Sequence, residues 1–224
     1  MYYFSYDNEG RMTEIASPFA EMKILIQYDP IVITMNDYTE DYDYETEKYT
    51  LRLSDQTVMK NVVTDANGNI TAYDATEYRY DEYGNVISSK TETYHQTLQY
   101  DSNGHLIYMS DPDGQTPSRY VWDNGCLMSC NMTDECDYTF EYSDIENKTK
   151  EWCPLWGDPA TLFMTGLFGN GPDRMVSRVV YNDGPYTDIN LYFAYKLNTA
   201  GQISAIRYYD SFEDTTMTLF YDYK

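Results

Sequence analysis

The 224-residue chain carries 37 Asp and Glu against 15 Lys and Arg, which gives a formal net charge of -22, and 26 of its residues are Tyr. A surface this acidic repels phosphate groups, so the composition excludes nucleic-acid binding and peripheral membrane binding through a basic patch. No run of the sequence approaches the roughly 20 apolar residues of a membrane-spanning helix. Because aromatic residues make up 17% of the chain and Tyr and Thr favour strands, the composition predicts an all-β fold.

The same short unit recurs along the chain. An alternating aromatic or aliphatic strand is followed by Asp or Asn, two or three polar residues, Gly, one further residue and an aliphatic residue, as in YDSNGHL at 100–106. Asp accepts hydrogen bonds from the backbone two residues on, and Gly adopts the positive φ that closes a tight hairpin. The pattern therefore predicts hairpins with the turn residues Asp7, Gly10, Asp65, Gly68, Asp81, Gly84, Asp101, Gly104, Asp123, Gly125 and Gly201.

These hairpins predict one domain over residues 1–224. The turn Asp residues at positions 65, 81, 101 and 123 are separated by 16, 20 and 22 residues, which is enough for two strands and two turns each. We expect a long antiparallel up-and-down meander of about 16 to 18 strands that closes into a soluble barrel or a flattened shell. Charged residues on the strand faces, such as Arg79 and Glu141, argue against a membrane porin, because charges at mid-bilayer are costly.

Residues 37–47 alternate Tyr with acidic residues. Their carboxylates could offer oxygen ligands to calcium, but the run has no Gly at a loop position and no EF-hand register. The alternation is typical of a strand with one solvated face, and we favour that interpretation. We predict no metal site and no cofactor.

The two histidines give no catalytic assignment. His95 lies among Thr and Gln on a predicted strand, and His105 follows a turn Gly. Neither has a neighbouring Cys or Ser that would suggest a nucleophile and its base. We therefore expect both histidines at the surface and name no catalytic residue.

The four cysteines lie close together in the sequence but lack the C-x-x-C spacing of a zinc site. A hairpin with its loop at 131–135 would place Cys130 and Cys136 across from each other, which suits a disulfide. If the next hairpin turns at 143–147, Cys136 lies beside Cys153 instead. Free thiols, including Cys126, are the third alternative, since free Cys is a common buried residue.

Residues 152–171 interrupt the hairpins. Asp158 suits a helix N-cap, Pro159 suits the first helical position, and Gly169 suits the end of a helix. The residues between them are apolar nearly all round, and a short helix of that kind has to be buried. The segment therefore predicts one short helix near 158–169 that plugs or covers the sheet.

The Tyr-Asp-x-x-Gly-x-aliphatic hairpins, as at 80–86, resemble YD repeats, the units that build the β shells of RHS-type secreted proteins. With the apolar segment, the GLFGNG sequence at 166–171 and the Val-Val-Tyr strand after it, the chain also resembles a family of secreted Bacteroidetes proteins of unknown function. That family is described as having a porin-like barrel fold and usually follows a lipoprotein-type signal. The resemblance covers about residues 1–224 and supplies no catalytic or binding residue.

The resemblance implies an exported protein that is secreted, periplasmic or anchored by lipid at the outer membrane or cell surface. The residues MYYFSY at 1–6 include neither a basic n-region nor the start of an apolar stretch. We therefore expect either an intracellular protein or one whose signal has been removed, and the resemblance favours removal.

The tyrosine excess is the main indication of function. Aromatic rings with a polar rim suit glycans and peptides, although Tyr before a turn also follows from strand propensity and cross-strand pairing. The sequence favours a non-enzymatic binding or structural module of the bacterial envelope, with a Tyr-lined cavity for a neutral or cationic glycan or peptide. The alternative is a secreted hydrolase that acts on glycans with paired carboxylates, for which 37 acidic residues single out no pair.

Overall fold

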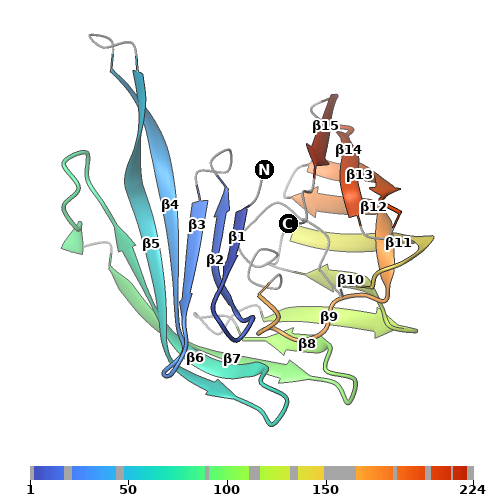
Figure 1. The fold of residues 1–224 in the computed structure, drawn as a ribbon, viewed down its shortest axis with the longest axis horizontal. Coiled ribbons are helices and arrows are strands. Elements are labelled where there is room, and N and C mark those ends of the chain that lie inside the picture. The colour runs from blue at the N-terminus through green and yellow to red at the C-terminus, as the bar shows by residue number, and fades with distance from the viewer. Residues whose placement is uncertain are drawn as a thin grey trace. The chain divides into compact units, whose positions relative to one another are not determined.

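The computed structural model describes residues 3–17, 22–43, 48–88, 91–110, 117–131, 136–148, 165–183, 186–199, 203–212 and 214–220. Strands make up most of this part of the chain (Figure 1). They are β1 (Tyr3–Tyr6), β2 (Met12–Ser17), β3 (Met22–Gln27), β4 (Val32–Asp43), β5 (Lys48–Thr64), β6 (Ile70–Arg79), β7 (Glu92–Tyr100), β8 (Leu106–Met109), β9 (Ser118–Asp123), β10 (Cys126–Asn131), β11 (Cys136–Glu146), β12 (Arg174–Asp183), β13 (Tyr186–Leu197), β14 (Ile203–Asp210) and β15 (Thr215–Phe220).

The order of the strands in the sheet follows their order in the sequence, from β1 to β15. Tight turns join antiparallel neighbours, so a chain of hairpins gives this arrangement. The predicted all-β antiparallel meander is confirmed, with 15 strands in the described part of the chain. Among those strands β1 and β15 each pair on one side only, so the expected closure into a barrel is not found and the sheet order is open.

Contacts within the chain define two compact units: unit 1 comprises Met1–Thr64 and Thr71–Thr97, and unit 2 comprises Asp65–Ile70 and Leu98–Lys224. In unit 1 the apolar residues of neighbouring strands share one face. Ile24 of β3 lies beside Ile15 of β2 on one side and Met35 of β4 on the other, and all three are buried. A strand alternates its side chains with a period of two, so this register sends the residues between them to the opposite face.

Unit 2 is built in the same way. Phe140 of β11 lies beside Val179 of β12, which lies beside Leu191 of β13, and all three are buried. The positions between these residues carry polar and charged side chains, among them Glu141 and Arg178. The sheet of unit 2 therefore has one apolar face and one polar face.

The predicted helix near 158–169 is wrong over the residues that can be compared. Residues 165–168 form a turn and a bend, and Gly166, which lies inside the predicted helix, has a left-handed φ of +72°. The interior of a right-handed helix does not accept such a residue. Residues 158–164 lie outside the described part of the chain. No helix in the described residues is long and apolar enough to cross a membrane.

Four of the hairpin turns share one pattern of hydrogen bonds. In the turn of Asp101, carboxylate Oδ1 accepts the backbone amides of Asn103 at 2.8 Å and His105 at 2.9 Å. The amide of Gly104 donates to the Asp101 carbonyl at 3.1 Å, and the φ of Gly104 is +80°. The same bonds and a positive φ recur in the turns of Asp7 with Gly10, Asp65 with Gly68, and Asp81 with Gly84.

The residue after the turn Gly adds a side-chain bond to the same carboxylate. This position lies four residues after the Asp, and its side chain donates to the carboxylate in the copies with Arg11, Asn69 and Asn85. The turn at Asn124 and Gly125 is shorter and has φ values of +48° and +74°, as a two-residue type I′ turn requires. Gly201 lies outside the described residues.

Replacement of Gly84 by Val should destabilise the protein by at least about 1 kcal/mol more than replacement by Asn, because Asn tolerates a left-handed backbone and a β-branched residue does not. A side chain at this position meets no other atom within 4 Å, so the difference reports backbone strain alone. Urea denaturation of both variants measures it. Equal stabilities would contradict the turn geometry.

Replacement of Asp81 by Asn should cost most stability above about pH 5 and progressively less below it. The backbone amide of Asn85, followed by its side chain and the amide of Tyr83, lowers the pKa of Asp81. The ionised carboxylate therefore stabilises the folded state fully above the unfolded pKa of about 3.9, and this is lost as the pH falls through the lower folded pKa. The measurement is the difference in Tm between parent and variant against pH. A difference that is constant down to about pH 3 would contradict it.

Candidate functional site

Aromatic side chains tie successive hairpins together. The hydroxyl of Tyr100 donates to the carbonyl of Ile70 at 2.7 Å, and the indole Nε1 of Trp122 donates to the carbonyl of Leu106 at 2.8 Å. The acceptor stands two residues after a turn Gly in each case. Two further pairs follow the same rule, Tyr28 with Met12 at 3.0 Å and Tyr142 with Leu127 at 2.8 Å.

These bonds account for part of the tyrosine excess. Each of these rings covers the preceding hairpin while its polar end is satisfied by the backbone, which a buried hydroxyl or indole requires. Tyr195 makes a comparable bond to the carbonyl of Val176. Tyr73 and Tyr208 are themselves buried, and burial raises the pKa of Tyr73. The polar ends of these rings therefore join neighbouring strands within the protein.

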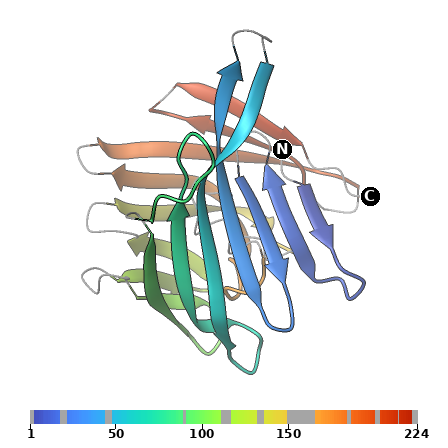
Figure 2. The same cartoon turned by 90° about the vertical axis from the view of Figure 1, so that its left-hand side faces the viewer.

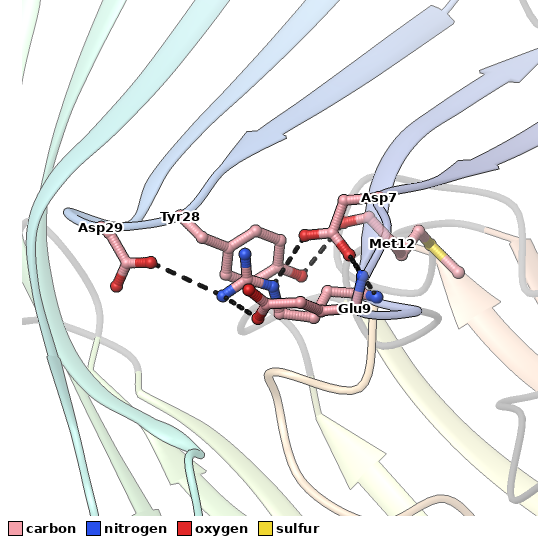
Figure 3. Close-up of polar contacts among 6 residues, drawn as sticks. Asp7, Glu9, Met12, Tyr28 and Asp29 are labelled. Atoms are coloured by element: carbon pink, nitrogen blue, oxygen red, sulfur yellow. Dashed lines mark hydrogen bonds and ion pairs between the residues drawn. The ribbon is translucent and has the colours of Figure 1, made fainter.

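In unit 1 the guanidinium of Arg11 forms ion pairs with Asp7, Glu9 and Asp29, the three carboxylates labelled in Figure 3. The guanidinium lies 4.4 Å from the centre of the Tyr28 ring, with Nε 2.8 Å from Asp7 Oδ2. Its Nη1 lies 3.2 Å from Glu9 and 3.6 Å from Asp29. The side-chain hydrogen bond from Arg11 lowers the pKa of Asp7. Arg11 already supplies the cation that these three carboxylates attract, so the group stabilises the hairpin of β1 and β2.

Residues 165–173, which we call the strap, run across the glycine turns of unit 2. The Leu167 carbonyl accepts the amide of Ile70 at 2.8 Å, and the amides of Asn170 and Asp173 donate to the carbonyls of Gly104 and Gly125 at 2.9 and 2.8 Å. Buried Asn147 holds the end of the strap, since its Nδ2 donates to the Pro172 carbonyl at 2.9 Å. Phe168 is 1% exposed. This part of the apolar segment covers the hairpins as a loop.

The two histidines lie in different surroundings. The prediction of a surface position is wrong for His105, which is buried: its ring stacks on Trp122 at 4.2 Å and its Nδ1 lies 3.0 Å from Asp101 Oδ2. Trp122 reaches this ring from β9, a contact that the local sequence does not encode.

His95 is exposed as predicted, and its Nδ1 lies 2.7 Å from Asp74 Oδ1. The amide of Asn61 donates to the other Asp74 oxygen at 2.7 Å, and this bond and the one from His95 lower the pKa of Asp74. Asp74 can orient the imidazole of His95, but the residues bonded to this pair include no nucleophile, and we assign the pair no catalytic role.

The described residues include no group of three or more His, Cys, Asp or Glu that could hold a metal ion. Residues 37–43 belong to β4, as the alternation predicts, and residues 44–47 lie outside the described part of the chain. Burial raises the pKa of the Cys126 thiol. Cys130 pairs in register with Tyr138, two residues away from Cys136.

That register places positions 130 and 136 on a diagonal across the hairpin, where Cβ atoms are about 7 Å apart and a disulfide needs about 4 Å. The side chain of Cys136 and all of Cys153 lie outside the described residues. Both disulfide pairings therefore stay predictions.

The candidate site is an exposed row of side chains on the polar face of unit 2. Registers between β12, β13 and β14 place Arg178 beside Tyr192 and Tyr192 beside Tyr209. The two rings are stacked, with centres 6.2 Å apart and an angle of 29° between their planes. We call Tyr192 and Tyr209 the tyrosine platform. Tyr192 is 44% exposed, so its ring faces solvent.

Polar groups border the tyrosine platform on both sides. Arg178 lies 5.6 Å from the centre of the Tyr192 ring and donates to Glu141 at 2.7 Å and to the side-chain Oδ1 of Asn190 at 2.8 Å. The Tyr209 hydroxyl donates to Asp214 at 3.0 Å, and this bond raises the pKa of Tyr209. The row thus offers two aromatic faces between hydrogen-bonding groups whose charges are partly neutralised.

Comparison with known proteins identifies the fold. No family model matches the chain, and no curated protein matches it. The chain is similar to the crystal structure of a porin-like protein from Bacteroides uniformis, with 15% identity and a TM-score of 0.57 over 99% of this chain and 89% of that one. It also aligns with a porin-like protein from Bacteroides vulgatus, with 12% identity and a TM-score of 0.45 over 97% of this chain and 90% of that one.

At such low identity the likeness to the Bacteroides uniformis protein shows the fold alone. The porin-like part of the expected resemblance is confirmed at that level, while the resemblance to YD repeats stays a prediction. The fold of this protein is that of a porin-like β-sheet protein.

Replacement of Gly169 by Ala should destabilise the protein by about 2–4 kcal/mol. The new Cβ would lie 2.5 Å from the Gly104 carbonyl oxygen and 2.8 Å from the Tyr100 ring, at a φ of +93°. Gly166 is the matched control, because its φ is +72° but nothing lies within 4 Å of an added Cβ, so its replacement should cost about 1 kcal/mol. Chemical denaturation compares the two. Similar losses would show that the strap does not pack against this turn.

Proposed function

We propose that the protein is a non-enzymatic binding module of the bacterial envelope that binds neutral glycans on the tyrosine platform. The observation that carries the proposal is the stacked pair of Tyr192, which is exposed, and Tyr209, which is half-buried, on the polar face of the sheet. Aromatic faces stack on the apolar faces of sugar rings, and a polar rim then binds the hydroxyls.

The borders of the platform support a neutral ligand. Glu141 and Arg178 form an ion pair, so neither offers a full charge to a ligand. The net charge of -22 repels acidic glycans and phosphorylated ligands at longer range. Arg178 donates to Oε1 of Glu141, and the other carboxylate oxygen of Glu141 can accept a sugar hydroxyl.

The proposal places the ligand on an open face and not in the cavity expected from the sequence, because four tyrosine hydroxyls are bonded to backbone carbonyls of neighbouring strands. Binding without turnover fits this face better than hydrolysis. A glycosidase needs two available carboxylates on either side of the scissile bond, whereas Glu141 is paired with Arg178 and Asp214 accepts from Tyr209. Placement in the envelope is supported by the likeness of fold to a porin-like protein of Bacteroides.

Replacement of Tyr192 or Tyr209 by Ala should weaken binding of a neutral glycan by about fivefold to thirtyfold, since each ring contributes about 1–2 kcal/mol of buried contact. The experiment screens neutral oligosaccharides by thermal shift and measures affinity by calorimetry for those that stabilise the parent protein. Replacement of Tyr192 by Phe keeps the ring and should change affinity by less than about twofold.

Tyr83 provides the matched control, because it is 81% exposed and belongs to unit 1, whereas the platform belongs to unit 2. Its replacement by Ala should leave binding unchanged. The proposal is wrong if no neutral glycan stabilises the protein, or if the Tyr83 and Tyr192 variants lose affinity equally. Release of shorter sugars from a bound glycan would favour the hydrolase.

A further inference from the structure

Asparagine precedes glycine four times in the sequence, at Asn67, Asn103, Asn124 and Asn170. Such a pair is chemically labile, because glycine has no side chain that hinders its backbone amide from attacking the side chain of the asparagine before it. The hydrogen bonds around the four pairs differ, and these differences indicate which pair can react. Figure 2 shows the hairpins of the sheet that carry these turns.

The reaction is a spontaneous deamidation that consumes water. The glycine nitrogen forms a bond to Cγ of the asparagine, the bond between Cγ and Nδ2 breaks, and ammonia leaves with the proton of the amide. The succinimide that remains is opened by water at one of its two carbonyls, which gives either Asp or isoaspartate. A glycine amide that donates a hydrogen bond has to give up this bond before it can attack.

The pairs at Asn67 and Asn103 belong to the Asp-Gly turns and are held by them. The amides of Gly68 and Gly104 donate to the carbonyl of the turn Asp at 3.1 Å in both copies. The amides of Asn67 and Asn103 donate to the carboxylate of the same Asp at 2.8 Å. Both attacking amides are therefore engaged, although both asparagines are exposed.

The pair at Asn170 is held by the contacts of the strap. Nδ2 of Asn170 donates to the carbonyl of Asn103 at 2.7 Å. The backbone amide of Asn170 donates to the carbonyl of Gly104 at 2.9 Å, and Gly171 is buried. The asparagine is therefore fixed at its side chain and its backbone, and burial keeps water from the attacking amide.

The pair of Asn124 and Gly125 forms the two-residue turn between β9 and β10. The hydrogen bonds of such a turn join the residues that flank it, here Asp123 and Cys126. Within the described part of the chain, no hydrogen bond engages the amide of Gly125. Asn124 is exposed, and its Nδ2 donates to the carboxylate of Asp123 in the same turn at 3.0 Å. Of the four pairs, this one therefore has the least to give up before it reacts.

We infer that Asn124 is a site of spontaneous deamidation and that its reaction releases the end of the strap. The carbonyl of Gly125 accepts the amide of Asp173 at 2.8 Å. The carboxylate of Asp173 lies against Gly125, since a Cβ added to Gly125 would overlap it. Deamidation adds a carboxylate to the residue before Gly125, and isoaspartate lengthens the backbone of the turn by a methylene group. Both effects oppose the contact with Asp173, because like charges repel and the carbonyl of Gly125 moves.

The test incubates the whole protein in a warm, mildly alkaline buffer and follows the four pairs by peptide mapping with mass spectrometry. In the folded protein Asn124 should deamidate at least about fivefold faster than each of the other three asparagines, which is the factor that one hydrogen bond provides. The same incubation in urea is the control. It gives the intrinsic rate of each pair in the unfolded chain, and there the four rates should be similar.

Hydrogen exchange then tests the strap in the incubated protein. The amide of Asp173 should lose protection, whereas the amide of Asn170, which donates to the turn of Gly104, should keep it. Asn124→Asp supplies the product of ordinary linkage without incubation and should show part of this loss. Asn124→Gly accepts the left-handed backbone, cannot deamidate, and should keep the Asp173 amide protected after the same incubation. A cooperative thermal melt before incubation checks that both variants are folded.

Three results would overturn the inference. The first is a rate at Asn124 in the folded protein that is no higher than the rates of the other three pairs. The second is an Asp173 amide that stays protected in protein modified at Asn124, and the third is an equal loss of protection in the incubated Asn124→Gly variant. The inference does not depend on the proposed glycan site, because no step of the test measures a glycan.

Discussion

The carboxylate of each turn Asp is the group on which the rest of the sheet depends. In four turns one of its oxygens accepts two backbone amides, and the side chain four residues on bonds to the same carboxylate. All of these groups lie within five residues, so each turn is specified locally. Because each turn is tight, every strand pairs with the strand that follows it in the sequence. The order of the strands in the sheet therefore runs from β1 to β15.

Aromatic residues then join one hairpin to the next. The aliphatic residue two positions after the turn Gly has two roles in the turns of Gly68 and Gly104. The side chains of Ile70 and Leu106 are buried, and their carbonyls accept hydrogen bonds from Tyr100 and Trp122. The strap uses the same turns again in unit 2, through the carbonyls of Gly104 and Gly125. The Asp-Gly turns and many of the tyrosines therefore have structural roles. The functional proposal rests on aromatic residues that have no such role.

The proposed glycan surface lies in unit 2. The tyrosine platform consists of rings whose neighbouring charges are paired, so it favours a neutral ligand through stacking and hydrogen bonds.

The sequence by itself determined the strands, their antiparallel order and the Asp-Gly turns, because alternation and turn chemistry act within a few residues. The tertiary structure decided what depends on contacts between distant segments. His105 is buried because Trp122 stacks on it. Residues 165–173 form a strap because they bond to turns that lie 48 to 97 residues earlier in the sequence. The sheet order stays open because β1 and β15 do not pair among the described strands. Tyr100 and Tyr192 both lie on strands, and the sequence alone does not distinguish their roles. The strand register decides that the hydroxyl of Tyr100 bonds to a neighbouring hairpin, whereas the ring of Tyr192 is exposed.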